Sequence, residues 1–324
     1  ASNREFMRAV VFDGRVQFLQ RYAIPEVPRD WARIRVHLAG ICGTDMEILK
    51  GYQQFKGVLG HEFVGVVDQC DCADWLGQRV VGEINVSCGQ CEWCKRGLKR
   101  HCARREVLGI RHLNGCMADY CVLPTSNLVI VPAAMTHEVA LLIEPLSAAC
   151  EILDQVQLAG TERAVVLGDG PLGILCAWVL STVLSDVTLA GRHPYKMEKA
   201  KWRTIKMVQG AHRGLYGADI VVEATGSTKG LSEAMALCRP RGIIVLKSTV
   251  STGERMNLSS VVVNEQTIVG SRCGAFEAGF KLLRTYPDMP LQRLITAFYP
   301  IEHASEAFDR AAGSDVLKIA LNLN

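Results

Sequence analysis

Thirteen cysteines lie in this 324-residue chain, and four of them are grouped closely enough to bind one metal ion. Cys88, Cys91, Cys94 and Cys102 fall at intervals of three, three and eight positions. Three thiolates at a spacing of three can surround an ion, and the fourth can complete a tetrahedron. A closed set of four protein ligands leaves no position for water, so we predict a structural zinc site.

An iron–sulfur cluster is the alternative for this group of cysteines. The bacterial ferredoxin run has its fourth cysteine after three residues, followed by proline. Here seven residues precede Cys102 and Ala103 follows it, which favours zinc. The lobe around the four cysteines, about residues 86–104, is rich in Lys and Arg and poor in apolar residues. We therefore expect the bound ion to supply much of the free energy that folds this lobe.

A second metal site is predicted from single candidate ligands. Cys42 and His61 are each flanked by glycine, and Glu62 follows His61. Glu144 lies in an otherwise apolar run, where a carboxylate needs a compensating partner such as a cation. Pro145 disfavours helical geometry at the residue before it, so we expect a helix break at Glu144. One Cys, one His and one or two carboxylates predict an open zinc site with a position left for water or substrate.

A glycine-rich loop predicts a dinucleotide-binding site. The pattern GxGxxG begins at residue 168, directly after a predicted strand and at the start of a predicted helix. In this context the pattern is typical of dinucleotide binding, with the pyrophosphate at the helix N-terminus. The predicted cofactor-binding residues of the loop are Gly168, Gly170, Pro171, Leu172 and Gly173.

The end of the next predicted strand bears on the choice of dinucleotide. NAD-binding folds place Asp or Glu there, about twenty residues beyond the glycine loop, to bind the ribose hydroxyls. Here the strand ends in Gly191, Arg192 and His193, and Lys196 follows. Because a carboxylate is missing and cations are present, we predict NADP(H) over NAD(H). The alternative is that these cations form an ordinary solvated face.

The elements that must position these residues fall into two groups. Short β-type runs separated by Gly and Pro fill the first part of the chain, and a helical pattern follows from 136 to 153. Strands and helices then alternate, which predicts a parallel sheet with helices on both faces. The runs of the first part are 8–12, 31–38, 63–67, 79–82 and 127–131; the later strands are 163–167, 186–190, 219–223 and 242–246, and the later helices 171–184, 195–202 and 228–238. The last forty residues either extend this sheet or return to the first domain.

Composition excludes several classes of protein. Hydrophobic residues make up 49% and charged residues 21% of the chain, as in globular proteins and unlike disordered or collagen-like chains. A net charge of +3 does not indicate a nucleic-acid or membrane-surface partner. No run of about 18 apolar residues occurs, so we expect no membrane span. The N-terminal residues lack an export signal, and we expect a cytoplasmic protein whose grouped cysteines bind metal rather than form disulfides.

The motifs, taken in their order along the chain, resemble the zinc-dependent medium-chain dehydrogenase/reductase family, which includes alcohol, sorbitol, threonine and glucose dehydrogenases. Segments 144–147, 217–226 and 270–272, together with Lys318, contribute to the resemblance. It implies an α/β protein with a GroES-like, β-rich catalytic domain and a Rossmann domain with a doubly wound parallel sheet. The corresponding bounds are 1–150, 151–288 and, for a C-terminal segment that returns to the catalytic domain, 289–324.

The resemblance also implies an activity and a set of partners. We expect a zinc-dependent oxidoreductase that passes hydride between the CH–OH group of a small alcohol, polyol or aldose and NADP(H) or NAD(H). It implies two zinc ions per chain and a homodimer or homotetramer. Cys42 and His61 would bind the catalytic zinc, and Glu62, Glu144 and water would share its remaining positions.

Further residues receive roles on the same basis. We expect Thr44 to accept the substrate proton first and Glu47 or water to accept it next. Asp45 would orient a zinc ligand rather than react. Arg272 either reaches the cofactor or pairs with a carboxylate.

Three departures from the family pattern bear on function. Glu47 stands where many relatives have a relay histidine, so the proton route differs here. The pattern Cys-Gly-Thr-Asp-x-Glu from residue 42 is similar to that of glucose dehydrogenases and favours an aldose or polyol substrate. The segment 196–219 is short, so we expect a strand or helix to be missing from the Rossmann domain.

A function of another class remains as an alternative. A non-catalytic NADP(H)-binding protein, acting as a redox sensor or partner, would need structural zinc only. It would bind one zinc ion per chain and would not reduce NADP with an alcohol.

Overall fold

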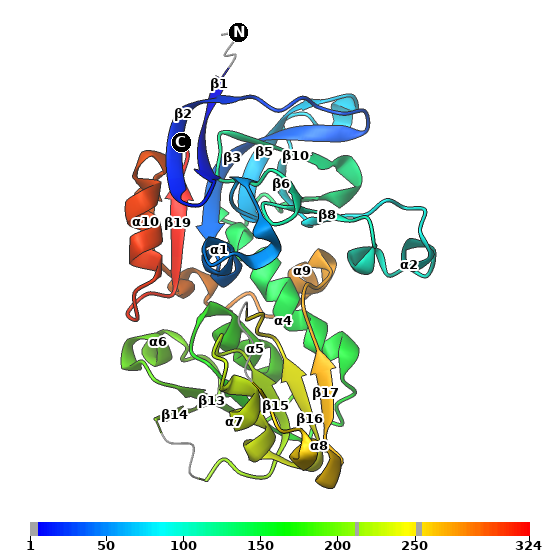
Figure 1. Cartoon of the computed structure of the whole chain (residues 1–324), viewed down its shortest axis with the longest axis vertical. Coiled ribbons are helices and arrows are strands. Elements are labelled where there is room, and N and C mark those ends of the chain that lie inside the picture. The colour runs from blue at the N-terminus through cyan, green and yellow to red at the C-terminus, as the bar shows by residue number, and fades with distance from the viewer. Residues whose placement is uncertain (1–5, 211–213, 251–254) are drawn as a thin grey trace. The chain divides into compact units, whose positions relative to one another are not determined.

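The computed structural model describes residues 6–210, 214–250 and 255–324, and it divides the chain into two compact units (Figure 1). The first unit comprises Ala1–Ile143 and Ile295–Asn324, and the second comprises Glu144–Leu294. The first unit therefore contains both ends of the chain, with the second inserted between its parts.

The first unit is built around the long strand β3 (Trp31–Ile41). Alternate residues of β3 are buried along its first half, as expected for a strand with one face on a core. β3 pairs antiparallel with β5 (Glu62–Cys70), β10 (Tyr120–Pro124) and β19 (Lys318–Asn322). The full order of this sheet is β11 (Leu128–Ile130), β6 (Arg79–Gly82), β5, β3, β19 and β18 (Ile295–Pro300). Because β19 pairs with β3, the C-terminal segment joins the sheet of the first unit.

Smaller elements complete the first unit. β1 (Phe6–Phe12), β2 (Val16–Ala23) and β4 (Gly57–Val58) form a three-stranded sheet. β7 (Asn85–Val86), β8 (Glu106–Leu108) and β9 (His112–Leu113) form another, at the base of the cysteine-rich segment. The helices are α1 (Gly43–Leu49), α2 (Glu92–Lys95), α3 (His137–Leu141) and α10 (Ala304–Ala311).

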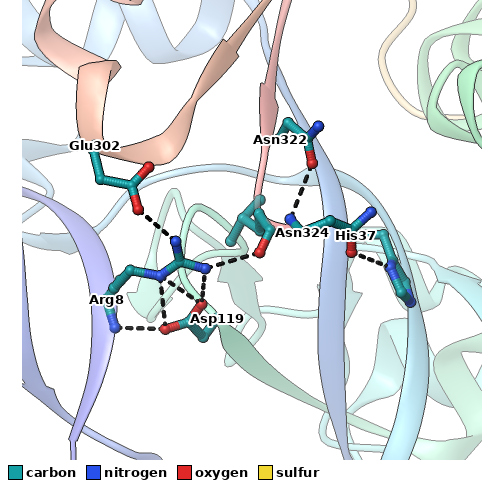
Figure 2. A network of polar contacts seen from close by, with 7 residues as sticks. Arg8, His37, Asp119, Glu302, Asn322 and Asn324 are labelled. Carbon is teal, nitrogen blue, oxygen red and sulfur yellow. Dashed lines mark hydrogen bonds and ion pairs between the residues drawn. The ribbon is translucent and has the colours of Figure 1, made fainter.

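A polar network joins the two ends of the first unit (Figure 2). The guanidinium of Arg8 on β1 donates to the Asp119 carboxylate at 2.7 Å and to the Leu323 carbonyl at 2.8 Å, and it also pairs with Glu302. The ring of His37 on β3 lies 2.7 Å from the side-chain oxygen of Asn324. These contacts hold the C-terminal segment against β1 and β3.

The second unit contains a six-stranded, fully parallel sheet. Its order is β14 (Lys206–Gln209), β13 (Asp186–Gly191), β12 (Arg163–Leu167), β15 (Ala218–Glu223), β16 (Cys238–Leu246) and β17 (Thr267–Gly270). Reading outward from β12 in both directions gives the doubly wound order of a Rossmann sheet. The predicted β-rich first domain and doubly wound parallel sheet are confirmed.

The helices of the second unit cover this sheet. α5 (Pro171–Ser181) packs on β12 and β13, and α7 (Gly230–Leu237) packs on β15 and β16. α5 is buried from Gly173 to its end, which explains why its sequence is apolar on all sides. The other helices are α4 (Ile143–Gln155), α6 (Pro194–Lys199), α8 (Ser259–Val263) and α9 (Phe276–Thr285). Across the described ranges, every helix falls short of the length and apolarity that a bilayer crossing requires.

The predicted helix break lies two residues away from its expected place. α3 ends at Leu141 with Leu142 as its C-cap, and Glu144 is inside the first turn of α4. The expectation of a break at Glu144 is therefore wrong. Pro145 also stands in this first turn, where a backbone N–H has no helical partner and proline is tolerated.

The short segment before β15 lacks a helix rather than a strand. β14 is present with four residues and pairs in parallel with β13. Between Gln209 and Ala218, no helix occurs in the residues that the structure describes. Several strands were not predicted, among them β2, β10, β14 and β17. The residues of β2 are mostly half-buried without alternation, so their pairing with β1, rather than a sequence pattern, makes them a strand.

Candidate metal and dinucleotide sites

The four predicted zinc cysteines lie together in the lobe that carries α2. Sulfur–sulfur distances are 3.5 Å for Cys91–Cys94, 3.8 Å for Cys91–Cys102 and 4.0 Å for Cys88–Cys94. Tetrahedral zinc with bonds of about 2.3 Å places its sulfur ligands roughly 3.8 Å apart. The arrangement therefore fits a zinc ion bound by four thiolates.

The local backbone favours the thiolate form at one end of this cluster. Backbone N–H groups, chiefly those of Gln90 and Cys91, lower the pKa of Cys88 to about 6. Burial raises the pKa of Cys94 to about 11. A dication would compensate the buried negative charge, as it does in structural zinc sites.

A second cluster contains Cys42, His61 and Glu62. One ligand atom from each of these residues lies within 4.8 Å of the other two. Cys42 is the N-cap of α1, His61 lies between β4 and β5, and Glu62 is the first residue of β5. The register pairs Glu62 with Gly40 of β3, and a Cβ at Gly40 would lie 2.5 Å from the Glu62 carboxylate. Glycine at position 40 therefore makes room for this carboxylate.

The buried polar atoms of this cluster have unused bonding capacity. Glu62 Oε1 is buried without a hydrogen-bond partner, and His61 Nδ1 has no partner closer than the Asp45 carboxylate at 3.5 Å. His61 is 3% exposed and Glu62 is fully buried, so water does not satisfy these atoms. A thiolate, an imidazole and a carboxylate are ligands that zinc accepts, and this donor set fits an open zinc site.

Asp45 orients two members of the cluster. Its carboxylate accepts the backbone N–H of Cys42 at 2.8 Å and lies 3.5 Å from Nδ1 of His61. Burial lowers the pKa of His61, but the nearby charge of Asp45 outweighs burial and raises it well above the usual value. A carboxylate beside one ring nitrogen leaves the other nitrogen to face a metal ion.

Lys318 contacts this cluster in a way that the sequence did not reveal. Its Nζ lies 2.6 Å from Oε2 of Glu62, and both side chains are buried. This ion pair leaves only Oε1 of Glu62 for a metal ion. The two residues are 256 positions apart, so no local pattern signals the contact.

The remaining predicted residues of this region are placed as follows. Thr44 is half-buried in the first turn of α1. Glu47 accepts a hydrogen bond from Lys50 Nζ at 2.8 Å. Glu144 belongs to the second unit, where it is the first residue and half-buried.

The glycine loop has the shape that the sequence predicts. Gly168 has a φ of 112°, a conformation that side chains rarely adopt, and it follows β12 directly. A Cβ at Gly173 would collide with the carbonyl of Gly168, so helix and loop approach closely here. Gly170 is the N-cap of α5 and Pro171 is its first residue, so the N-terminus of this helix is open to an anion.

The predicted 2′-phosphate residues follow β13. Arg192 is exposed, whereas His193 is half-buried and is the N-cap of α6. The His193 ring lies 3.0 Å from the carboxylate of Asp169, a loop residue without a predicted role. Lys196 is half-buried in α6.

Another buried cation lies near the predicted cofactor residue Arg272. Lys247 Nζ donates to the carbonyls of Ala148 and Arg272 at 2.6 and 2.8 Å and to Ser271 Oγ at 3.0 Å. Burial lowers the pKa of Lys247. These bonds fix the backbone that follows β17, and Arg272 is therefore held through its carbonyl.

These observations define a protein of two units, one β-rich with two clusters of potential metal ligands and one with the parallel sheet and glycine loop of dinucleotide-binding folds. Comparisons with known proteins agree with this class. Residues 28–133 match the model of the alcohol dehydrogenase GroES-like domain, and residues 137–323 match that of the glucose dehydrogenase C-terminus. The chain belongs to the zinc-dependent medium-chain dehydrogenase/reductase family.

Individual proteins are similar over nearly the whole chain. The starvation-sensing protein RspB of Escherichia coli K12 is 29% identical, with 88% of this chain and 89% of the relative covered. Erythritol/L-threitol dehydrogenase of Mycolicibacterium smegmatis is 28% identical, with 98% of each covered. The crystal structure of the alcohol dehydrogenase rspB from Escherichia coli CFT073, complexed with NADH, has a TM-score of 0.88 at 26% identity and covers 98% of this chain and 99% of that one.

Proposed function

We propose that the chain is a zinc-dependent dehydrogenase that oxidises an alcohol group of a small polyol with a nicotinamide dinucleotide. The observation that carries the proposal is the cluster of Cys42, His61 and Glu62, with donor atoms within 4.8 Å of one another. Three protein donors of these types are typical of catalytic zinc and leave one position for substrate. The four-cysteine cluster would hold a second, structural zinc ion.

The chain's own residues divide the remaining work. When bound, zinc would act as a Lewis acid on the substrate oxygen. Asp45 fixes Cys42 and His61, as its contacts with both indicate. We propose Thr44 as the first acceptor of the substrate proton. Glu47, three residues further along α1, is the next acceptor.

Glu144 is proposed as a second carboxylate ligand that exchanges with Glu62. Its support is the chemistry of the donor and the pairing of Glu62 with Lys318, which occupies one Glu62 oxygen. Because Lys318 occupies that oxygen, a second carboxylate would give the metal ion a further oxygen ligand.

A polyol is the favoured substrate class. Its support is the similarity to erythritol/L-threitol dehydrogenase. An aldose is the second candidate, because residues 137–323 match a glucose dehydrogenase model. For the dinucleotide, exposed Arg192 and nearby Lys196 favour a bound 2′-phosphate, and we propose NADP(H) ahead of NAD(H).

Initial rates test this function. The zinc-replete chain is mixed with NAD⁺ or NADP⁺ and with ethanol, erythritol, sorbitol or glucose, and formation of reduced cofactor is followed at 340 nm. We expect reduction with at least one polyol, and its loss in Cys42→Ser. Glu144→Gln should lower the rate without removing the structural zinc. Absence of cofactor reduction with every alcohol would instead favour the non-catalytic alternative.

We also propose that copies of the chain associate as a homodimer or homotetramer. β17 is the last strand at one edge of the described sheet, and Val262 and Val263 beside it in sequence are 76% and 80% exposed. An open strand edge next to apolar side chains is typical of an interface between chains. Light scattering should give a mass of two or four chains, reduced by Val262→Asp with Val263→Asp.

A further inference from the structure

The loop residue Asp169 lies at the end of β13, where dinucleotide-binding folds place an acid. Its Oδ2 accepts the backbone N–H groups of Arg192 and His193 at 2.8 and 2.7 Å. Its Oδ1 lies 3.0 Å from Nδ1 of His193. The Asp169 carboxylate, although it belongs to the loop after β12, is therefore held beside the residues that end the neighbouring strand.

The Asp169 side chain occupies the space that a side chain at Gly191 would need. A Cβ added at Gly191 would lie 2.6 Å from both Cβ and Oδ2 of Asp169. The volume that a side chain at position 191 would use is thus filled by the Asp169 carboxylate. The strand end lacks an acid of its own, and the structure supplies one from 22 positions earlier in the sequence.

The Asp169 side chain is an anion with capacity for a further partner. Burial raises the pKa of Asp169, but the bonds from the His193 ring and from the N–H groups of His193 and Arg192 outweigh it and lower the pKa. A carboxylate offers about four acceptor positions, and Oδ2 takes both backbone bonds. Oδ1 faces only His193 among the hydrogen bonds above, so one position remains for a hydroxyl group.

The same contacts make three groups unavailable to a phosphate. The N–H groups of Arg192 and His193 bond to Asp169, and the His193 ring is paired with it. Of the three cationic residues predicted to bind a 2′-phosphate, Arg192 and Lys196 remain unpaired with this carboxylate. A 2′-phosphate would meet one fixed anion together with these two cations.

We propose that Asp169 is a specificity-determining residue for the dinucleotide, binding the adenosine ribose hydroxyls and opposing a 2′-phosphate. This inference rests on the proposed function, since it concerns the same cofactor site. It reduces the expected difference in affinity between NADP(H) and NAD(H). With Asp169 present, the chain binds NAD(H) as well as NADP(H). Removal of the negative charge shifts the preference toward NADP(H).

Equilibrium binding tests the inference without reference to turnover. Dissociation constants for NADH and NADPH are measured by calorimetry on the full, zinc-replete chain and on Asp169→Asn. The asparagine oxygen still accepts the two backbone N–H groups, so the turn is kept while the charge is lost. We expect the ratio of NADPH to NADH affinity to rise by at least about tenfold, because a like charge near the phosphate is removed.

Further variants separate this role from a structural one. Asp186→Asn removes a carboxylate at the other end of β13, where it pairs with Lys206, and should leave the ratio unchanged. The double variant Asp169→Gly with Gly191→Asp removes the Asp169 Cβ that lies 2.6 Å from a Cβ at position 191. It moves the carboxylate to the strand end and should return the ratio to the wild-type value or below. Asp169→Gly alone, which also removes the charge and should raise the ratio, decides the question if Asp169→Asn folds poorly.

The outcomes distinguish the inference from the proposed function. If wild type binds both dinucleotides and loss of the Asp169 charge in Asp169→Asn, or in Asp169→Gly, leaves the ratio unchanged, Asp169 has only a structural role and the inference is wrong. Equal losses of affinity for NADH and NADPH in Asp169→Asn lead to the same conclusion. A wild-type chain that binds neither dinucleotide contradicts the proposed function itself, and the inference with it.

Discussion

The Glu62 carboxylate connects two cations of different kinds, a lysine that the structure contains and a metal ion that its free oxygen can bind. Lys318 neutralises one oxygen at 2.6 Å in a fully buried position. A single charge buried away from water is costly in free energy. Each of these two side chains therefore needs the other to compensate its charge. Lys318 therefore stabilises the fold and limits how Glu62 can bind zinc.

Substitution of Lys318 by methionine should destabilise the chain strongly. The variant leaves the Glu62 carboxylate buried without its cation, and we expect a loss of about 3–5 kcal/mol in the free energy of unfolding. Urea unfolding of wild type, Lys318→Met and the double variant Lys318→Met with Glu62→Leu measures this. The double variant should recover most of the loss, and a loss below about 1 kcal/mol in the single variant would contradict the pairing.

At the scale of elements, polar contacts connect the ends of strands whose middle residues pack in the apolar core. Asp219 on β15 accepts the N–H of Arg163 at 2.7 Å and pairs with the guanidinium of Arg239. These bonds connect the starts of β12, β15 and β16. The cysteine lobe depends in the same way on its four thiolates, since little apolar surface is available within it.

The Asp219 contact predicts a pH-dependent contribution to stability. The N–H of Arg163 and then the Arg239 side chain lower the pKa of Asp219 in the folded state. Its stabilising effect is therefore fully present above the unfolded pKa, about 3.9, and is lost as the pH falls through the lower folded pKa. Asp219→Asn should cost about 1–2 kcal/mol at pH 7 and pH 5, and this difference should shrink below about pH 4.

Urea unfolding at pH 7, 5 and 3.5 checks this prediction. The exposed pair of Asp186 and Lys206 is the control, because Asp186→Asn should cost no more than about 0.5 kcal/mol at any pH. A difference between wild type and Asp219→Asn that stays constant down to pH 3.5 would argue against a lowered pKa.

Loss of one thiolate should unfold the lobe while the sheets remain. Structural zinc supplies roughly 10–16 kcal/mol of apparent binding free energy in small domains, so Cys94→Ser should release the ion and expose the lobe. Limited trypsin digestion checks this through faster cleavage at Lys95, Arg96 and Lys99, with unchanged circular dichroism of the sheets. The control Cys70→Ser, outside the lobe, should be digested at the wild-type rate. If Cys94→Ser were also digested at the wild-type rate, that result would contradict a structural role of the four cysteines in the lobe.

At the scale of the whole molecule, the order of elements was more predictable than the contacts between them. The alternating strands and helices of the second unit and the glycine loop were predicted because their patterns are local in sequence. The cysteine lobe was predicted for the same reason, and the structure brings its four sulfurs together. Cys42 and His61 are weak candidates singly, but together with nearby carboxylates they predicted an open zinc site, and the family resemblance then supported the same association.

Contacts between distant residues could not be predicted from local patterns. The sequence showed a strand end without an acid at Gly191, whereas Asp169 fills this place from another loop. The partner of Glu62 is 256 positions away, and only the pairing of β19 with β3 brings it near. The helix break near Pro145 was misplaced because proline is unfavourable inside a helix but acceptable in its first turn.

The central claim is that Cys42 and His61 hold a zinc ion in addition to the ion of the cysteine lobe. Zinc content per chain, measured by mass spectrometry on the purified, dialysed protein, tests it most directly. We expect two zinc ions in wild type, matching the two clusters, and one in Cys42→Ser. One zinc ion in wild type, or two in Cys42→Ser, would contradict the account.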